Sequence, residues 1–405
     1  MNTFGCTNET IAHSLPRSSS NGYYHRNPNH FTFNQFATDT KRVHLISSDL
    51  WEAITGERQT PSGICQILDS SVPMSNTPNS ISLQSMEYVL MARDRQGSRI
   101  LQKKLDESTP QDRTTIFNSL YPQLSELVYD TSGNFVIQKL CEYLTPEQQQ
   151  RMLNFFLENI QIIIDNPNGC RVLQKFIEFT TKPNISSIFD AVKPSFIPLC
   201  FSQNGNHIVQ RFIESLPDRT NEIIEAIEPH LFNLVVDNCG CRVIQRLFDR
   251  CPIDELENLV QEVLKCPEKL ATNQYGNYVV QNILAAGKKE HISALIKSFR
   301  GHFYEFSIHK FASNVIEKCI RDATKDEQME IFVEIIGDEN HFLKDRILRM
   351  ISDQFGNYVI QRIIENGSES MQNVIYEVVY DNFDDLNGNY AKHVIAKLEK
   401  MGFDF

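Results

Sequence analysis

The chain has 405 residues, 41% of them hydrophobic and 22% charged, which is typical of a soluble folded protein. This length exceeds what one hydrophobic core usually organises, so it predicts several domains or an array of repeats. The sequence contains no run of eighteen apolar residues, which excludes a membrane-spanning helix. The net charge of −12 by itself disfavours a nucleic-acid binder, although recognition depends on where the charges lie.

Residues 1–79 are rich in Ser, Thr and Asn and keep no helical or strand period, so we expect this region to be largely disordered. Its aromatic residues, Trp51 among them, suit a short docking or self-association motif. A solvated tail that covers the end of the folded domain is the simpler alternative. The first twenty residues lack the apolar core of a signal peptide, and ten cysteines are scattered along the chain. We therefore expect reduced thiols in a cytosolic or nuclear protein.

From Ser82 onward the sequence repeats itself, with a phrase such as Gly133-Asn134-Phe135-Val136-Ile137-Gln138 in each unit. The residue after the small one is called position a. In repeats one to eight, position a is Ser98, Asn134, Cys170, Asn206, Cys241, Asn277, Ser313 and Asn357. The spacings of 36, 36, 36, 35, 36, 36 and 44 residues predict eight repeats within residues 80–405.

Each phrase has the pattern of a helix with a recognisable start. The residues four positions before a are Asp94, Asp130, Asn166, Ser202, Asp237, Asn273, His309 and Asp353, and all but His309 are preferred N-caps. The aspartates could also suggest a metal-dependent nuclease, but they lie one repeat apart without a second carboxylate at ligand spacing. Further amphipathic stretches, such as Arg113–Val128 and Asp254–Leu264, supply another main helix per repeat. The expected fold is an all-α solenoid, a superhelical stack of eight repeats with terminal caps.

Around the helix, positions a, a+1 and a+4 lie at about 0°, 100° and 40°, opposite an apolar pair at a+2 and a+3. Position a+1 is Arg99, Phe135, Arg171, His207, Arg242, Tyr278, Asn314 and Tyr358. Position a+4 is Gln102, Gln138, Gln174, Gln210, Gln245, Gln281, Glu317 and Gln361. A flat side chain flanked by two polar ones, once per repeat, is what unpaired bases require for stacking and edge recognition. The glycine before a indicates close approach of a neighbouring helix or a ligand.

These eight phrases resemble those of the Pumilio (PUF) family, and the resemblance covers about residues 82–398. It implies a sequence-specific single-stranded RNA-binding protein in which Asn with Gln reads uracil, Cys or Ser with Gln reads adenine, and Ser with Glu reads guanine. It also implies an antiparallel RNA, so repeats eight to one spell 5′-UGUAUAUA-3′. The resemblance further implies that the protein binds mRNA 3′ untranslated regions and represses translation or promotes decay through deadenylase or translational-repressor proteins. We also expect it to be a cytoplasmic monomer.

Residues 389–395 resemble the C-terminal cap of this family, and we expect an N-terminal cap within residues 45–82. The 44-residue interval contains extra chain around Gly337–Asp345, which either serves protein partners, as in relatives, or is a tolerated surface insertion.

Position a+5 carries a cation in seven repeats, which predicts a ribbon that contacts the RNA backbone, with the acidic residues mainly on the opposite side. In repeats one to eight, position a+5 is Lys103, Lys139, Lys175, Arg211, Arg246, Asn282, Lys318 and Arg362, of which Asn282 is uncharged.

Other functions are weaker alternatives. Cys239 and Cys241 have no partner pair at zinc spacing, and no catalytic or phosphate-binding signature is present, so we expect neither enzyme activity, metal nor cofactor. A protein-binding armadillo- or HEAT-like scaffold would not restrict a+4 to Gln and Glu. A nuclear ribosome-assembly relative would carry less regular triplets and a more basic chain.

Overall fold

The computed structural model describes residues 83–338, 340–386 and 388–405. All of them belong to one compact unit, Thr77–Phe405, built almost wholly of helices. The expected all-α solenoid is therefore confirmed. The predicted tail over residues 1–79 and the N-terminal cap fall on residues outside the described part. Among the helices described, none has the length and apolar character needed to cross a bilayer.

Each repeat consists of three helices. The first is short in most repeats: α2 (Leu83–Arg93), α5 (Leu124–Leu127), α8 (Ile160–Asp165), α11 (Phe196–Phe201), α14 (Leu231–Val235), α17 (Pro267–Ala271), α20 (Phe303–Ser307) and α23 (Lys344–Ser352). The second helix carries position a: α3 (Arg95–Glu107), α6 (Gly133–Cys141), α9 (Pro167–Phe179), α12 (Asn206–Ser215), α15 (Gly240–Arg250), α18 (Gly276–Ala286), α21 (Ala312–Asp322) and α24 (Gly356–Asn366).

The third helices complete the repeats: α4 (Pro110–Leu120), α7 (Pro146–Glu158), α10 (Lys182–Val192), α13 (Thr220–Ile227), α16 (Glu257–Val263), α19 (Lys289–Phe299), α22 (Lys325–Ile336) and α25 (Glu369–Asp381). Short 3₁₀ turns join some of them: η1 (Tyr121–Gln123), η2 (Lys193–Ser195), η3 (Pro217–Arg219), η4 (Glu228–His230) and η5 (Ile253–Leu256). The amphipathic stretch Arg113–Val128 thus spans a third helix and the first helix of the next repeat.

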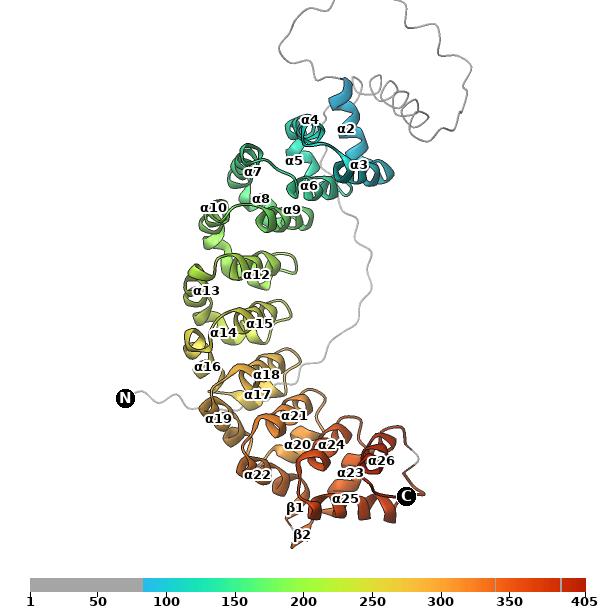
Figure 1. Ribbon diagram of the computed structural model, residues 1–405. Helices are drawn as coiled ribbons and strands as arrows, with labels where there is room; N and C mark the ends of the chain where they lie inside the picture. Colours follow the sequence, from blue (N-terminus) through green and yellow to red (C-terminus); the bar gives the residue numbers. More distant parts are fainter. Residues whose placement is uncertain (1–82, 339, 387) are drawn as a thin grey trace, which may run out of the picture. The chain divides into compact units, whose positions relative to one another are not determined.

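Successive second helices pack on one another from α3 to α24, and α26 (Ala391–Lys400) continues the row. Figure 1 shows this row along the inner side of the curved stack, with the third helices along the outer side. Equivalent positions of successive repeats are therefore neighbours in space, which places the predicted contact residues in a line.

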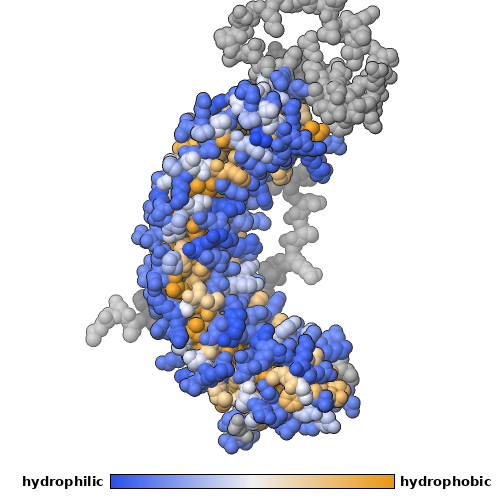
Figure 2. All heavy atoms as spheres, in the orientation of Figure 1, coloured by the Kyte–Doolittle hydropathy of each residue, from blue (hydrophilic) through white to orange (hydrophobic). Residues whose placement is uncertain are grey.

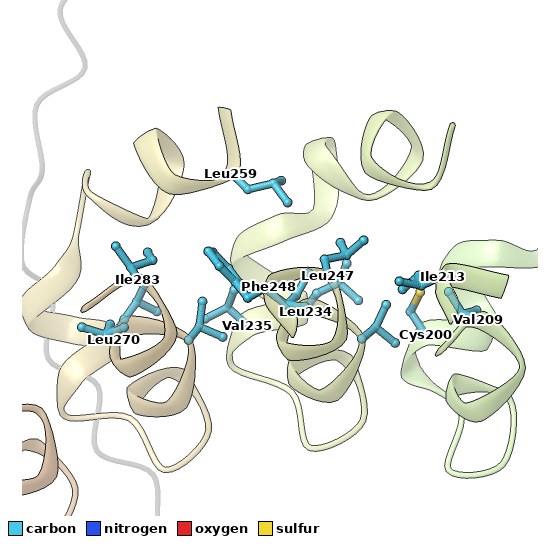
Figure 3. Close-up of a cluster of buried hydrophobic side chains, with 14 of the residues drawn as sticks. Cys200, Val209, Ile213, Leu234, Val235, Leu247, Phe248, Leu259, Leu270 and Ile283 are labelled. Carbon is cyan, nitrogen blue, oxygen red and sulfur yellow. The ribbon is translucent and has the colours of Figure 1, made fainter. Parts of the chain in front are cut away.

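The core lies between these layers. The apolar pair at a+2 and a+3 is buried in every repeat except at Ile100, which is half-buried. In the middle of the stack, Leu247 and Phe248 of α15 lie between Leu234 of α14 and Leu259 of α16 (Figure 3). In the space-filling view, apolar residues are visible mainly between the outer and inner rows, while the inner edge is largely hydrophilic (Figure 2). The stack therefore buries its apolar faces between layers and leaves the inner row polar.

The residue four before a caps the second helix in all eight repeats. Asp237, for example, accepts hydrogen bonds from the backbone N–H groups of Cys239 and Gly240, both at 2.8 Å. His309, the residue not expected to cap, also accepts through Nδ1 from Phe311 and Ala312, both at 3.2 Å. Regular helix begins directly after the cap only in α3 and α9, and three or four residues later in the other six repeats.

The glycine before position a lies against the first helix of its own repeat. A Cβ on Gly97 would lie 2.6 Å from the carbonyl oxygen of Met91, and one on Gly240 would lie 2.7 Å from that of Leu234. The close neighbour predicted at this position is thus a helix of the same repeat. Repeat seven accommodates the buried Ala312 here, and nothing in the structure explains why.

The extra chain before the last repeat forms a small antiparallel hairpin, β1 (Gly337–Asp338) and β2 (His341–Phe342). Gly337 has a φ of +92°, which a side chain would strain, so this glycine allows the chain to turn out of α22. The hairpin therefore accounts for the longer interval between repeats seven and eight.

Candidate nucleic-acid interface

All the predicted contact residues, three in each of eight repeats, lie on the second helices. Their exposure differs by position. Position a is buried in every repeat, with exposed fractions of 0–4%, although it lies on the same side of the helix as its two partners. Position a+1 is exposed and position a+4 is half-buried throughout. Burial therefore decreases within each triplet from a, through a+4, to a+1, and this graded set of three side chains is called a recess below.

In the four repeats with Asn at position a, the asparagine amide is fixed at both ends. In repeat six, Asn277 Nδ2 donates to the carbonyl of the cap residue Asn273 at 2.8 Å, and Asn277 Oδ1 accepts from Gln281 Nε2 at 2.9 Å. The same two bonds recur at 2.7–3.2 Å for Asn134, Asn206 and Asn357. The glutamine keeps its Oε1 and one N–H for a ligand.

The three repeats that pair Cys or Ser with Gln lack this bond between amides. Gln102 donates to the backbone oxygen of Ser98 at 3.1 Å, and Gln174 donates to the backbone oxygen of Asn204 in the next repeat at 3.2 Å. The Cys170 thiol donates to Ile164 O at 3.0 Å, and burial raises its pKa to about 12, so it stays protonated. These recesses have a small, neutral floor.

Repeat seven differs in charge. Its a+4 residue is Glu317, and Arg362 Nε of the next repeat donates to Glu317 Oε2 at 3.2 Å. Burial raises the pKa of Glu317, and the guanidinium of Arg362 acts in the opposite direction. This recess is the one of the eight with a carboxylate at a+4, and a carboxylate accepts hydrogen bonds without donating.

The a+1 side chains stand out from the row of second helices. The rings of Phe135, Tyr278 and Tyr358 are about half exposed, at 49–51%. Along the row, Arg or Asn alternates with an aromatic residue, so each aromatic ring has a non-aromatic a+1 neighbour. The pKa of His207 is lowered by burial and by the nearby charges of Arg242 and Arg171, which favours a neutral imidazole ring.

Six of the seven predicted cations at a+5 are paired with carboxylates, so acids also lie beside this row of cations. In repeats two to five the partner is the residue at a+8, both in the same repeat and in the preceding one: Lys139 pairs with Asp106 at 2.6 Å and with Glu142 at 2.7 Å. Lys175, Arg211 and Arg246 follow the same rule with Glu142, Glu178, Glu214 and Asp249 at 2.9–3.8 Å. In repeat one, Lys103 pairs instead with Glu107, at a+9, at 3.7 Å. These alternating charges are called the charge ladder below.

The charge ladder changes in the last repeats. Repeat six has Asn282 at a+5 and Ala285 at a+8, and Lys318 of repeat seven donates instead to the carbonyl of Gln281 at 3.2 Å. Arg362 pairs with Glu365, and Lys397 of α26 also pairs with Glu365, so the rule resumes at the C-terminal end. The regular ladder is thus interrupted between repeats five and eight.

Two features of this surface escaped the sequence analysis. An acid at a+8 lies three residues after the cation in six of the seven repeats with a basic a+5, a recurrence that could have predicted helical ion pairs. His309 stands at the cap position of an otherwise uniform column, which could have indicated that its ring nitrogen accepts the capping bonds.

A stack of three-helix repeats with one polar recess each defines a helical repeat protein that can bind an extended ligand along its inner row. A family model described as the Pumilio-family RNA binding repeat matches residues 87–120, 123–154, 166–193, 195–227, 230–264, 269–298, 302–336 and 346–379, more than half of the chain. The chain belongs to the Pumilio family.

Relatives share part of their length with this chain. A Pumilio domain-containing protein of Schizosaccharomyces pombe is 30% identical over 179 residues, 44% of this chain and 25% of the relative. Pumilio homology domain family member 4 of Saccharomyces cerevisiae is 31% identical over 153 residues, 37% of this chain and 17% of the relative. The matches thus span a quarter or less of these two proteins.

Solved structures resemble the described unit over most of its length. The Puf3 RNA binding domain bound to the Cox17 RNA 3′ UTR recognition sequence site B superposes with a TM-score of 0.71 at 30% identity, covering 77% of this chain and 94% of that domain. PUF-8 in complex with PBE-RNA gives a TM-score of 0.68 at 29% identity, covering 78% of this chain and 92% of that one.

Proposed function

We propose that the inner row of second helices binds single-stranded RNA, one base per repeat, with a preference for 5′-UGUAUAUA-3′. The observation that carries this proposal is the row of eight recesses, each with a buried polar or thiol side chain at a, a half-buried Gln or Glu at a+4 and an exposed side chain at a+1. Proteins of the same fold and about 30% identity are bound to 3′ UTR RNA.

The hydrogen bonds in each recess support the base assignment. In the Asn repeats, Gln presents one acceptor and one donor, which complements N3–H and a carbonyl of uracil. Ser and Cys are smaller than Asn and leave room for a purine, and the Gln beside them suits adenine, which also offers a donor and an acceptor. Glu317 offers acceptors alone, which match N1–H and N2–H of guanine.

The alternation at a+1 supports stacking. A base held between two successive repeats would meet an aromatic ring on one side and a guanidinium or amide on the other, as between Phe135 and Arg171. Base stacking on aromatic side chains is worth about 1–3 kcal/mol per base by substitution, so most of the affinity should come from bases.

As a function in the cell, we propose cytoplasmic regulation of mRNA by a monomer bound to 3′ untranslated regions, with reduced translation or faster decay through recruited deadenylase or repressor proteins. This role rests on the family and on 3′ UTR sequences bound by its relatives.

Selection from a random RNA pool on the full 405-residue chain tests the proposal. We expect enrichment of a UGUA core followed by alternating U and A. Enrichment of RNAs without a UGUA core would contradict the proposed base assignment, and a pool in which no RNA is enriched would instead favour a protein-binding scaffold.

Recoding one repeat tests the base assignment directly. Asn277→Ser combined with Gln281→Glu gives repeat six the residues of repeat seven at a and a+4 and leaves Tyr278 at a+1, so the preference at the third base should change from U to G. The discrimination should be about 1–3 kcal/mol, as for other base-edge contacts. Competition binding with four RNAs that differ at this base measures it, and unchanged preferences at the other seven bases are the control.

A further inference from the structure

Arg362 follows the charge-ladder rule within its own repeat, where it pairs with Glu365, but departs from it towards the preceding repeat. In repeats two to five, the cation at a+5 contacts the acid at a+8 of the preceding repeat, as Lys175 contacts Glu142 at 3.4 Å. For Arg362 in repeat eight, the corresponding residue of repeat seven is Arg321, a cation whose charge is paired with Asp322 at 2.8 Å. The usual partner is therefore replaced by a repulsive one.

Because repeat seven has no acid at a+8, Arg362 instead contacts the a+4 residue of that repeat, to which the proposed function assigns base recognition. Its Nε donates to Glu317 Oε2 at 3.2 Å, while its Nη1 contacts Glu365 of its own helix. Among the described repeats, this is the one in which a ladder cation bonds to an a+4 side chain. The contact is partly shielded, because the side chains of Arg362 and Glu317 are 41% and 21% exposed.

We propose that Arg362 is a specificity-determining positioning residue for repeat seven: it holds the Glu317 carboxylate ionised and oriented so that this repeat selects guanine. This inference rests on the proposed function. Arg362 acts through Glu317, and neither its sequence position nor the family code assigns it to a base.

The chemistry follows from the two states of the carboxyl group. Ionised, Glu317 is an acceptor that suits the two adjacent donors of guanine. When protonated, Glu317 gains a donor and resembles the glutamine of the other repeats, so guanine no longer binds better than adenine. One Oε2 lone pair is used by Arg362, which leaves Oε1 and the second Oε2 lone pair for the base.

The other charged groups around Glu317 do not replace Arg362. Glu365 of α24 is of the same sign and opposes ionisation. On α21 itself, Lys318 is directed to the carbonyl of Gln281 in α18, and Arg321 is paired with Asp322. Arg362 is the cation that is hydrogen-bonded to this carboxylate.

The test compares the binding of two RNAs, 5′-UGUAUAUA-3′ and the same sequence with A at the second base, to variants of the full chain. Arg362→Gln should lower the preference for G over A by about threefold, within the range of a part-exposed ion pair. Arg362→Lys, which keeps the charge, should restore most of the preference. Circular dichroism before binding shows whether each variant is folded.

Arg246→Gln is the matched control, because Arg246 is a ladder cation that pairs with Glu214 and Asp249 and with no base-reading residue. This variant should weaken the binding of both RNAs equally and leave the ratio of their affinities unchanged. A ratio that falls as much in Arg246→Gln as in Arg362→Gln, or that does not fall in Arg362→Gln, overturns the inference.

Glu317→Gln separates this inference from the proposed function. If it abolishes the preference for G while Arg362→Gln does not reduce it, guanine reading by Glu317 stands and the role of Arg362 fails. If Glu317→Gln itself leaves the preference intact, the base assignment of repeat seven fails, and the inference with it.

Discussion

Position a combines burial with polarity in six of the eight repeats. Asn, unlike an apolar residue, must be hydrogen-bonded when it is buried, and the structure supplies both partners of Asn277 from its own repeat. The cost of burying the amide is thereby offset before any ligand binds. The amide is also fixed in orientation, which is what a base-reading group requires.

The carboxyl group of Glu317 should make the preference for G over A at the second base depend on pH. Burial raises the pKa of this carboxyl group, so its acceptor-only state is lost at a higher pH than for an exposed glutamate. As the pH falls from about 7.5 to 5, the preference for G over A at the second base should decline. In Arg362→Gln the decline should begin at a higher pH, because the opposing charge is gone.

Binding assays over this pH range measure the effect, with Glu317→Gln as the control. That variant has no carboxyl group to titrate, so its G-to-A ratio should stay constant. A wild-type ratio that is equally constant would contradict the assigned role of the carboxylate.

Replacing Gly240 with alanine should create a packing defect. Its added Cβ would lie 2.7 Å from Leu234 O and 2.8 Å from Leu234 Cα, and backbone cannot move away as a side chain can. Gly240→Ala should lower the free energy of unfolding by about 1–3 kcal/mol. Gly388→Ala is the control, since its added Cβ has nothing within 4 Å. Urea titration of the two variants distinguishes them, and equal midpoints would exclude the contact.

At the scale of the element, the residue four positions before a stabilises the start of each second helix. In six repeats the cap lies before a short turn rather than directly before the helix, and its side-chain bonds, two in each of these repeats except one at Ser202, fix the turn that brings position a into register. A cap defect should therefore affect the recess as well as the stability.

Asp237→Ala removes two capping bonds from repeat five and should lower the free energy of unfolding by about 1 kcal/mol. Glu225→Ala, which removes an exposed carboxylate from α13, serves as the control and should change stability little. Thermal unfolding followed by circular dichroism compares them. A loss no larger than that of the control would mean that the cap is dispensable.

At the scale of the whole described unit, the charge ladder explains how an acidic chain can carry a row of cations on the side proposed to bind RNA. Each regular cation is neutralised by carboxylates of its own and the preceding repeat, so the ladder joins repeats instead of forming a positive surface. These are partly exposed pairs, and each contributes modestly to stability.

The ladder predicts a shallow salt dependence of RNA binding. Seven free cations that each displaced one counterion from a single strand would give a slope of log K against log salt of about −5. Because most of these cations are already paired, we expect a slope between about −1 and −3. Titrations from low to high potassium chloride measure it. A slope near −5 would show that RNA displaces the carboxylates.

The sequence alone determined the repeat, its period, the helix that carries position a and the three side chains offered by each repeat. These follow from local rules: the spacing of apolar pairs, the column of capping residues and the glycine that permits close packing. The family resemblance added the three-residue code, which periodicity could not supply.

The tertiary structure decided how these side chains meet one another. Whether position a is exposed or buried depends on the neighbouring helices, and the pairing of Lys139 with Asp106 or of Arg362 with Glu317 joins residues from different repeats. Such contacts depend on how the repeats stack, because one helix fixes the angle of its side chains but not what stands opposite them.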